Sequence, residues 1–271
     1  MSNSPQNPQQ ILEKALSNWQ VWQTGEATLN RQPEVLQELS GGKTNRSFLV
    51  ASGSFKAVVR VNAANSVSLG INRYREQKIL QLLQPTGFVP KVLFTSDQVL
   101  VTAYCEGRQW TEADLNNADN RRAVNSMLEQ IQSIAAPNLK ARNYVDYCTD
   151  YINQLGHSPK QVKSPKLIET ILSAAAEIDK TVWQPVICHH DLVPENIIVT
   201  ATGLILLDWE YAAMGHPALD YIRLYKSDLA STNLAYDRHT IEQLATVQNG
   251  MDDLWSLVQE RVQEGVQVSQ Q

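Results

Sequence analysis

The first hundred residues alternate short apolar runs with turn-forming residues, a pattern that predicts a β-rich region. Apolar residues at helical spacing predict one amphipathic helix over residues 10–23 and a second over residues 68–83. Between and after them, runs rich in β-branched and aromatic residues are bounded by glycine- and serine-containing turns, which is typical of strands. The predicted strands cover residues 35–40, 47–51, 55–61, 92–94 and 99–103.

The rest of the chain has a mainly helical pattern and follows a connector that contains Tyr104, Glu106 and Gly107. We therefore expect an α+β protein with two lobes. Residues 1–103 would form an N-terminal helix plus a β-rich lobe, and residues 104–271 a larger, mostly helical lobe. Helices are predicted over residues 111–134, 142–155, 165–181, 217–230 and 240–264, and strands over residues 186–188, 197–199 and 204–207.

Composition and charge narrow the class of protein. A net charge of −5 argues against a non-specific nucleic-acid binder, which needs a basic face to neutralise phosphates. The three cysteines (Cys105, Cys148, Cys188) are far apart, so neither a disulfide framework nor a zinc site is indicated. The N-terminus lacks the apolar core of a signal peptide, and no apolar run approaches the length of a membrane span. We expect a cytoplasmic protein without nucleic-acid or membrane partners.

The chemistry is concentrated in a segment that begins at His189. Asp191 lies in a loop, Asn196 follows five residues later at the start of a predicted strand, and Asp208 ends the next strand. A short turn between those strands would bring Asn196 and Asp208 to the same edge. Magnesium prefers carboxylate and amide oxygens, and a further carboxylate can accept the proton of an attacking hydroxyl. The spacing H-x-D-x-x-x-x-N followed by D therefore predicts phosphoryl transfer.

This segment resembles the catalytic motif of the aminoglycoside phosphotransferase and choline kinase superfamily. Its continuation, Asp208-Trp209-Glu210-Tyr211-Ala212, is most similar to choline, ethanolamine and bacterial thiamine kinases. The resemblance covers residues 35–225 and implies a protein-kinase-like two-lobed fold, with ATP and Mg²⁺ as cofactors and a small-molecule alcohol as substrate. It also implies that Asp191 is the catalytic base and that Asn196 and Asp208 hold the metal.

The turn between the first two predicted strands resembles the superfamily's G-G-x-x-N loop, which covers nucleotide phosphates. The resemblance assigns Gly41, Gly42 and Asn45 to the nucleotide. Backbone N–H groups at a glycine turn can approach an anion closely, which suits this role. The segment is not a Walker A motif, because Gln37 stands where the first glycine of that motif must be.

Further positions are expected at the nucleotide site. Arg60, in the third predicted strand, stands where the family has a basic residue on the nucleotide phosphates, so the resemblance implies that role for it. Glu76 on the following helix could orient Arg60 through a bidentate pair. Lys56 lies on the same strand face and is the weaker candidate. The connector is expected to offer backbone groups at Ala103 and Cys105 to adenine.

Several neighbouring side chains have a structural interpretation. His189 is expected to brace the catalytic loop through hydrogen bonds, and His190 to be a partly exposed neighbour. Asp220 is expected to tie down local backbone rather than bind substrate. Four aromatic residues are expected to serve packing, although a cation-binding role stays open: Trp209, Tyr211, Tyr221 and Tyr225.

Together these features predict an ATP-dependent kinase for a small cationic alcohol of the thiamine or choline/ethanolamine type, with a bacterial thiamine-type kinase slightly favoured. Two alternatives stay open: a kinase for another hydroxylated metabolite or an aminoglycoside, and a catalytically silent nucleotide-binding pseudokinase. A protein kinase is disfavoured, because Trp209-Glu210 replaces the Phe-Gly that follows the metal-binding aspartate in that family. The sequence defines neither the exact acceptor nor the oligomeric state.

Overall fold

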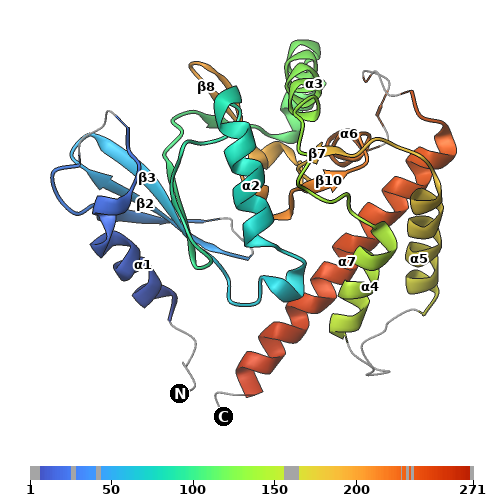
Figure 1. Ribbon diagram of the computed structural model, residues 1–271, viewed down its shortest axis with the longest axis horizontal. Helices are drawn as coiled ribbons and strands as arrows, with labels where there is room; N and C mark the ends of the chain where they lie inside the picture. The colour runs from blue at the N-terminus through green and yellow to red at the C-terminus, as the bar shows by residue number, and fades with distance from the viewer. Residues whose placement is uncertain are drawn as a thin grey trace.

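The N-terminal part of the chain forms a five-stranded antiparallel sheet (Figure 1). The computed structural model describes residues 7–25, 29–40, 44–155, 165–226, 228–229, 232 and 235–268, with side chains described to residue 259. The strands, in the spatial order β1-β2-β3-β5-β4, are β1 (Glu34–Leu39), β2 (Arg46–Ser52), β3 (Phe55–Val61), β4 (Val92–Thr95) and β5 (Val99–Ala103).

Two helices cover opposite faces of this sheet (Figure 1). Helix α1 (Pro8–Ser17) packs its apolar residues on the face that carries Val59 and Val61 of β3. Helix α2 (Arg73–Leu83) lies on the other face, toward which Arg60 points. Because successive side chains of a strand point to opposite faces, β3 can supply both an apolar core and a buried charge.

The C-terminal part is mainly helical and contains two small sheets. Helices α4, α5 and α7 pack side by side around one apolar core, while α3 covers the short strands (Figure 1). The helices are α3 (Ala118–Gln132), α4 (Tyr144–Leu155), α5 (Pro165–Lys180), α6 (Leu219–Tyr225) and α7 (Arg238–Val268). The strands pair as β10-β7 and β6-β8-β9, with bounds β6 (Arg108–Gln109), β7 (Val186–Cys188), β8 (Ile197–Thr200), β9 (Gly203–Leu206) and β10 (Ala213–Gly215).

The α+β class with a β-rich N-terminal region and a helical C-terminal region is confirmed. Short 3-10 turns occur at Trp19–Val21, Val67–Leu69, Gln84–Thr86, Glu112–Asn116, Pro194–Asn196 and Trp209–Tyr211. Within the ranges that the structure describes, no helix combines the length and the apolar character needed to cross a membrane.

Two predicted helices start at a different place in the structure. The helix predicted from residue 68 begins only at Arg73, because Gly70 adopts a left-handed conformation with φ of +67°. The side chain of Asn72 then caps the first turn. The helix predicted over residues 111–134 is divided by Asn117, whose side chain accepts hydrogen bonds from the first N–H groups of α3.

Two other differences concern the end of one helix and the presence of two short strands. The helix predicted over residues 217–230 ends at Tyr225, since Lys226 has a positive φ of 55°. Strands β6 and β10 were not predicted from the sequence. They have two and three residues, too few for an alternating pattern, and they form because β8 and β7 offer paired edges.

The connector after β5 passes very close to β8. Arg108 pairs with Val199, and a Cβ atom placed on Gly107 would lie 2.2 Å from the carbonyl oxygen of Val199. Only a residue without a side chain permits this approach. The contact joins the connector to the strand that begins directly after Asn196.

Gly107→Ala should therefore lower the free energy of unfolding by about 1–3 kcal/mol, the usual cost of overpacking where the neighbouring atoms cannot move away. Urea denaturation of the variant and the wild type measures this difference. Glu106→Ala is the matched control, because its side chain is exposed one residue earlier. Equal losses in the two variants would show that the close approach to Val199 is not the cause.

Candidate active site

The loop between β7 and β8 is held by two buried side chains. The backbone N–H groups of His189 and His190 donate to the two oxygens of the Asp220 carboxylate at 2.7 and 2.9 Å. The buried ring of His189 contacts the carbonyl oxygen of Leu207 through Nε2 at 2.7 Å. His189 thus braces the loop and Asp220 ties its backbone, as predicted, while His190 is partly exposed.

Asp191, Asn196 and Asp208 meet at one pocket of about 650 Å³. Asn196 Nδ2 donates to the carbonyl oxygen of Asp191 at 2.9 Å, so its Oδ1 is the atom that remains for a metal. The N–H of Leu207 donates to the carbonyl oxygen of Asn196 at 2.8 Å and places Asp208 beside it. The pairing of β8 with β9 brings the two strand ends together, as the short turn between them requires.

Asp208 has a backbone conformation that is rare for a residue with a side chain. Its φ of 58° lies in the left-handed region, which residues other than glycine adopt uncommonly and which is found more often at active sites than elsewhere. The carboxylate is accessible from the pocket, yet the pocket walls displace much of its water. This desolvation, with the nearby Glu210 carboxylate, raises the pKa of Asp208 to about 7, against the opposite effect of Arg60, whose Nη1 lies 3.5 Å from Asp208 Oδ1.

These oxygen donors suit a divalent cation. The pKa of Asp208 is raised mainly by burial and also by the nearby Glu210 carboxylate, and a hard cation beside Asp208 would favour its charged form. Within the described ranges, no three His, Cys, Asp or Glu side chains gather closely enough to hold a metal by themselves. A carboxylate and an amide oxygen with ligands supplied by phosphates and water is the usual arrangement for Mg²⁺.

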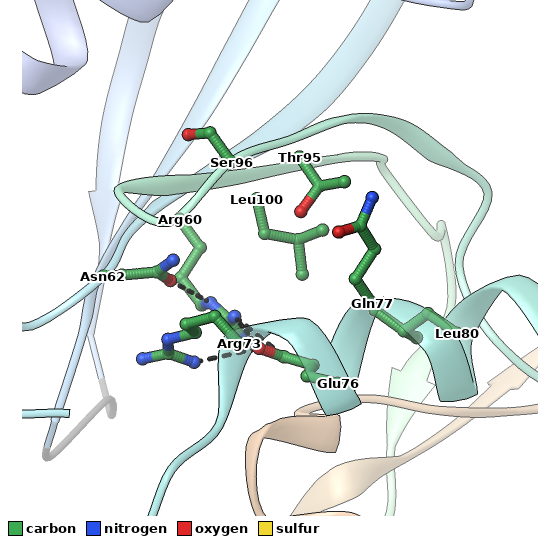
Figure 2. Close-up of a pocket in the computed structure, with 9 residues that line it drawn as sticks. All are labelled: Arg60, Asn62, Arg73, Glu76, Gln77, Leu80, Thr95, Ser96 and Leu100. Atoms are coloured by element: carbon green, nitrogen blue, oxygen red, sulfur yellow. Dashed lines mark hydrogen bonds and ion pairs between the residues drawn. The ribbon is translucent and has the colours of Figure 1, made fainter. Parts of the chain in front are cut away.

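A buried ion-pair network, of which Figure 2 draws Arg60, Arg73 and Glu76, is linked to this donor set by the approach of Arg60 to Asp208. Arg60 Nη2 lies 2.8 Å from the Glu76 carboxylate, so the structure brings together the two residues that the sequence paired. Although burial opposes the charge, Glu76 and Asp208 raise the pKa of Arg60. Lys56 is exposed and lies over the ring of Tyr104 at 5.7 Å, away from these carboxylates.

The network extends to two residues that the sequence did not indicate. Arg73 Nη1 lies 3.0 Å from both Glu76 and Glu210. Asn45 Nδ2 donates to Glu210 at 2.6 Å, and Asn45 Oδ1 accepts from Arg73 at 2.9 Å. The signals were present: Arg73 is three residues before Glu76 on the same helical face, and Glu210 is two residues after Asp208.

The remaining nucleotide-site candidates are placed as follows. Gly41 and Gly42 lie outside the described residues, while Asn45 at the end of their loop is anchored to Glu210. The N–H of Ala103 donates to the carbonyl oxygen of Lys91 at 2.8 Å. Cys105 is half-buried, and its Sγ lies 3.8 Å from the carbonyl oxygen of Ala103. These two contacts fix the start of the connector at the end of β5.

The far wall of the pocket is aromatic. Three of its tyrosines lie on one face of α4, at a spacing of three and four residues that the sequence could have revealed. Tyr211 joins them, and its hydroxyl accepts a hydrogen bond from Trp255 of α7 at 2.7 Å. The aromatic residues of this wall are Tyr144, Tyr147, Tyr151, Tyr211 and Trp255.

Of the four aromatic residues for which a cation-binding role stayed open, only Tyr211 lines the pocket. Trp209, Tyr221 and Tyr225 are buried in the core beside α3 and do not line the pocket. The Tyr225 hydroxyl donates to Asn125 at 2.7 Å. These three residues serve packing because the 3-10 turn and α6 direct them inward.

Comparison with known proteins agrees with this architecture. A LicA homolog protein of Mycoplasma capricolum subsp. capricolum is 30% identical over 156 residues, which cover 56% of this chain and 61% of that protein. The crystal structure of choline kinase LicA from Streptococcus pneumoniae superposes with a TM-score of 0.70 at 21% identity, covering 83% of this chain and 87% of that one. A structure of LicA in complex with AMP gives a TM-score of 0.77 at 21% identity, covering 93% and 90%.

These likenesses show a shared fold, while a family model decides the assignment. The match spans less than two thirds of the Mycoplasma protein, and the two solved structures are too distant in sequence to show more than architecture. The model of the choline/ethanolamine kinases matches residues 36–241, which include nearly all of the sheet, the loop between β7 and β8, and the metal-site candidates. Because this match covers most of the chain, the chain belongs to the choline/ethanolamine kinase family.

Proposed function

We propose that this chain transfers the γ-phosphate of ATP to the hydroxyl of a small cationic alcohol of the choline or ethanolamine type. The observation that carries the proposal is one pocket in which Asp191, Asn196 and Asp208 face an aromatic wall. The family match supports a small-molecule kinase, and the similarity to a LicA structure with AMP supports a nucleotide site.

On the nucleotide side, Arg60 would neutralise phosphate charge, held in place by Glu76. Asn196 and Asp208 would hold Mg²⁺, which when bound draws charge from the phosphates and orients them. The backbone of the loop at Gly41 and Gly42 would cover the phosphates, with Asn45 fastening its end. The connector at Ala103 and Cys105 would face adenine.

On the acceptor side, Asp191 would be the base. Its carboxylate accepts the proton of the acceptor hydroxyl, whose oxygen bonds to the γ-phosphorus as the bond to the β-phosphate oxygen breaks and ADP leaves. The protein contributes mainly position and charge, because the transferred group needs little further chemistry.

The acceptor pocket suits a cation for two reasons. Among its described lining residues, acidic side chains outnumber basic ones, and tyrosine and tryptophan rings attract a cation held over their faces by about 0.5–2 kcal/mol each. The family model favours choline or ethanolamine over the thiamine acceptor that the sequence slightly favoured.

A substrate panel tests the proposal directly. Offered Mg-ATP with choline, ethanolamine, thiamine, homoserine and kanamycin, the wild type should show the highest kcat/KM with choline or ethanolamine. A tenfold higher kcat/KM with kanamycin or a neutral alcohol would overturn the acceptor class.

Asp191→Asn should keep nucleotide affinity while turnover falls about 100-fold or more, since a positioned base contributes about that factor. Full turnover in Asp191→Asn would show that Asp191 is not the base.

Asp208→Ala should abolish most of the magnesium dependence of nucleotide binding, because the variant loses the carboxylate of the metal site. Calorimetric titration with ATP in the presence and absence of Mg²⁺ measures the effect without turnover. Glu195→Ala is the control, since Glu195 is an exposed acid at the rim of the same pocket. Unchanged Mg-ATP affinity in Asp208→Ala would show that the metal is bound elsewhere.

Arg60→Met should weaken ATP binding much more than acceptor binding, because the proposed partner of its guanidinium is the phosphate group of ATP. Glu76 and Asp208 hold the guanidinium beside the proposed metal site. Lys56→Met removes the same charge from the same strand and should change ATP affinity little. Dissociation constants for an ATP analogue distinguish the two. A larger loss in Lys56→Met would move the phosphate contact to Lys56.

A further inference from the structure

Arg223 of α6 lies between the candidate base and an acid of α7. Its Nη2 lies 2.8 Å from Asp191 Oδ1, and its Nη1 forms an ion pair with Asp252. The side chain of Arg223 is 21% exposed and lines the same pocket as Asp191. Arg223 is therefore next to the reacting centre, although neither the motif spacing nor the resemblance assigned it a role.

Helix α6 holds the catalytic loop at two levels. Asp220 accepts from the backbone N–H groups of His189 and His190, which fixes the path of the loop. Arg223 follows three residues later, on the same face of the helix, and reaches the side chain of Asp191. Backbone and side chain of the candidate base are thus set from one rigid element.

The contact defines the orientation of the Asp191 carboxylate. The backbone around Asp191 is held separately, since its N–H faces His189 Nδ1 at 3.3 Å and its carbonyl oxygen accepts from Asn196 at 2.9 Å. These bonds leave the side-chain torsions undetermined. With Oδ1 engaged by Arg223, Oδ2 is the oxygen left for the acceptor hydroxyl.

Charge at the site is balanced from two sides. Asp191 and Asp208 bring two carboxylates to one pocket. Arg60 offsets this charge on the nucleotide side, and Arg223 offsets it on the other. Although burial opposes its charge, Asp252 and Asp191 raise the pKa of Arg223, which remains a cation.

We propose that Arg223 is a positioning residue that fixes the Asp191 carboxylate with Oδ2 toward the acceptor, and that Asp252 anchors its second arm. The inference rests on the proposed kinase function. A guanidinium suits the task because its planar fork can hold two carboxylates at once, which a lysine ammonium does less well. Asp252 is three residues before Trp255 on α7, so one helix supports both the aromatic wall and the arginine.

The first test is a split between kcat and KM. Arg223→Gln should lower kcat about 10- to 100-fold, because a misplaced reacting group typically costs up to about that factor, while KM for Mg-ATP and acceptor stays within about twofold. Arg223→Lys should fall between this variant and the wild type, and Asp252→Asn should lose a smaller part of kcat. Asp253→Asn is the matched control, an exposed acid one residue further along α7 that should leave kcat unchanged.

The second test uses stability rather than activity. The changes in unfolding midpoint of Asp191→Asn and Arg223→Gln should not add up in the double variant, because each single change removes the same contact. Additive changes in the midpoint would overturn the contact.

The kinetic outcomes distinguish the possible roles of Arg223. An unchanged kcat in a folded Arg223→Gln variant would overturn the positioning role. An increased acceptor KM with unchanged kcat would instead make Arg223 a binding residue. A wild type inactive on every alcohol would sink the kinase function itself, an outcome distinct from the other three.

Discussion

The buried ion-pair network of Arg60, Glu76, Arg73 and Glu210 is the interaction on which the geometry of the site depends. It joins strand β3, helix α2 and the 3-10 turn that follows Asp208, three segments separated by up to 150 residues in the sequence. Removing one partner from a buried charge pair typically costs about 3–5 kcal/mol, since the other charge is left without compensation. The network therefore holds the sheet and the segment that follows Asp208 in one relative position.

The same network also determines how charge is distributed across the pocket. Arg60 and Arg73 lie among the carboxylates of Glu76, Asp208 and Glu210. Arg223 pairs with Asp191 and Asp252. Between them, Asp208 keeps a raised pKa, mainly because of burial and also because of the nearby Glu210 carboxylate. Arginine and carboxylate side chains thus alternate at the site, and the aromatic wall lines the same pocket.

Contacts of the loop after β7 and of the connector fix the backbone around the pocket. Asp220 and His189 fix the backbone that carries Asp191, and the close passage of Gly107 along Val199 fixes the connector against β8. Each of these contacts uses a buried polar atom or a backbone atom, which tolerates little displacement. Positions of this kind are expected to tolerate substitution less well than the exposed residues beside them.

The sequence by itself determined the elements and the reaction class. Apolar periodicity predicted the five strands of the sheet and most helices, and the spacing of Asp191, Asn196 and Asp208 predicted phosphoryl transfer, because these features depend on neighbours along the chain. Only the tertiary structure placed Arg73, Glu210 and Arg223 at the site. Their partners are distant in sequence, and no local pattern tells a buried ion pair from a solvated charge. The same reason explains why Tyr211 and Trp255 reach the pocket while Trp209 and Tyr221 enter the core: direction is decided by packing between elements, which periodicity does not encode.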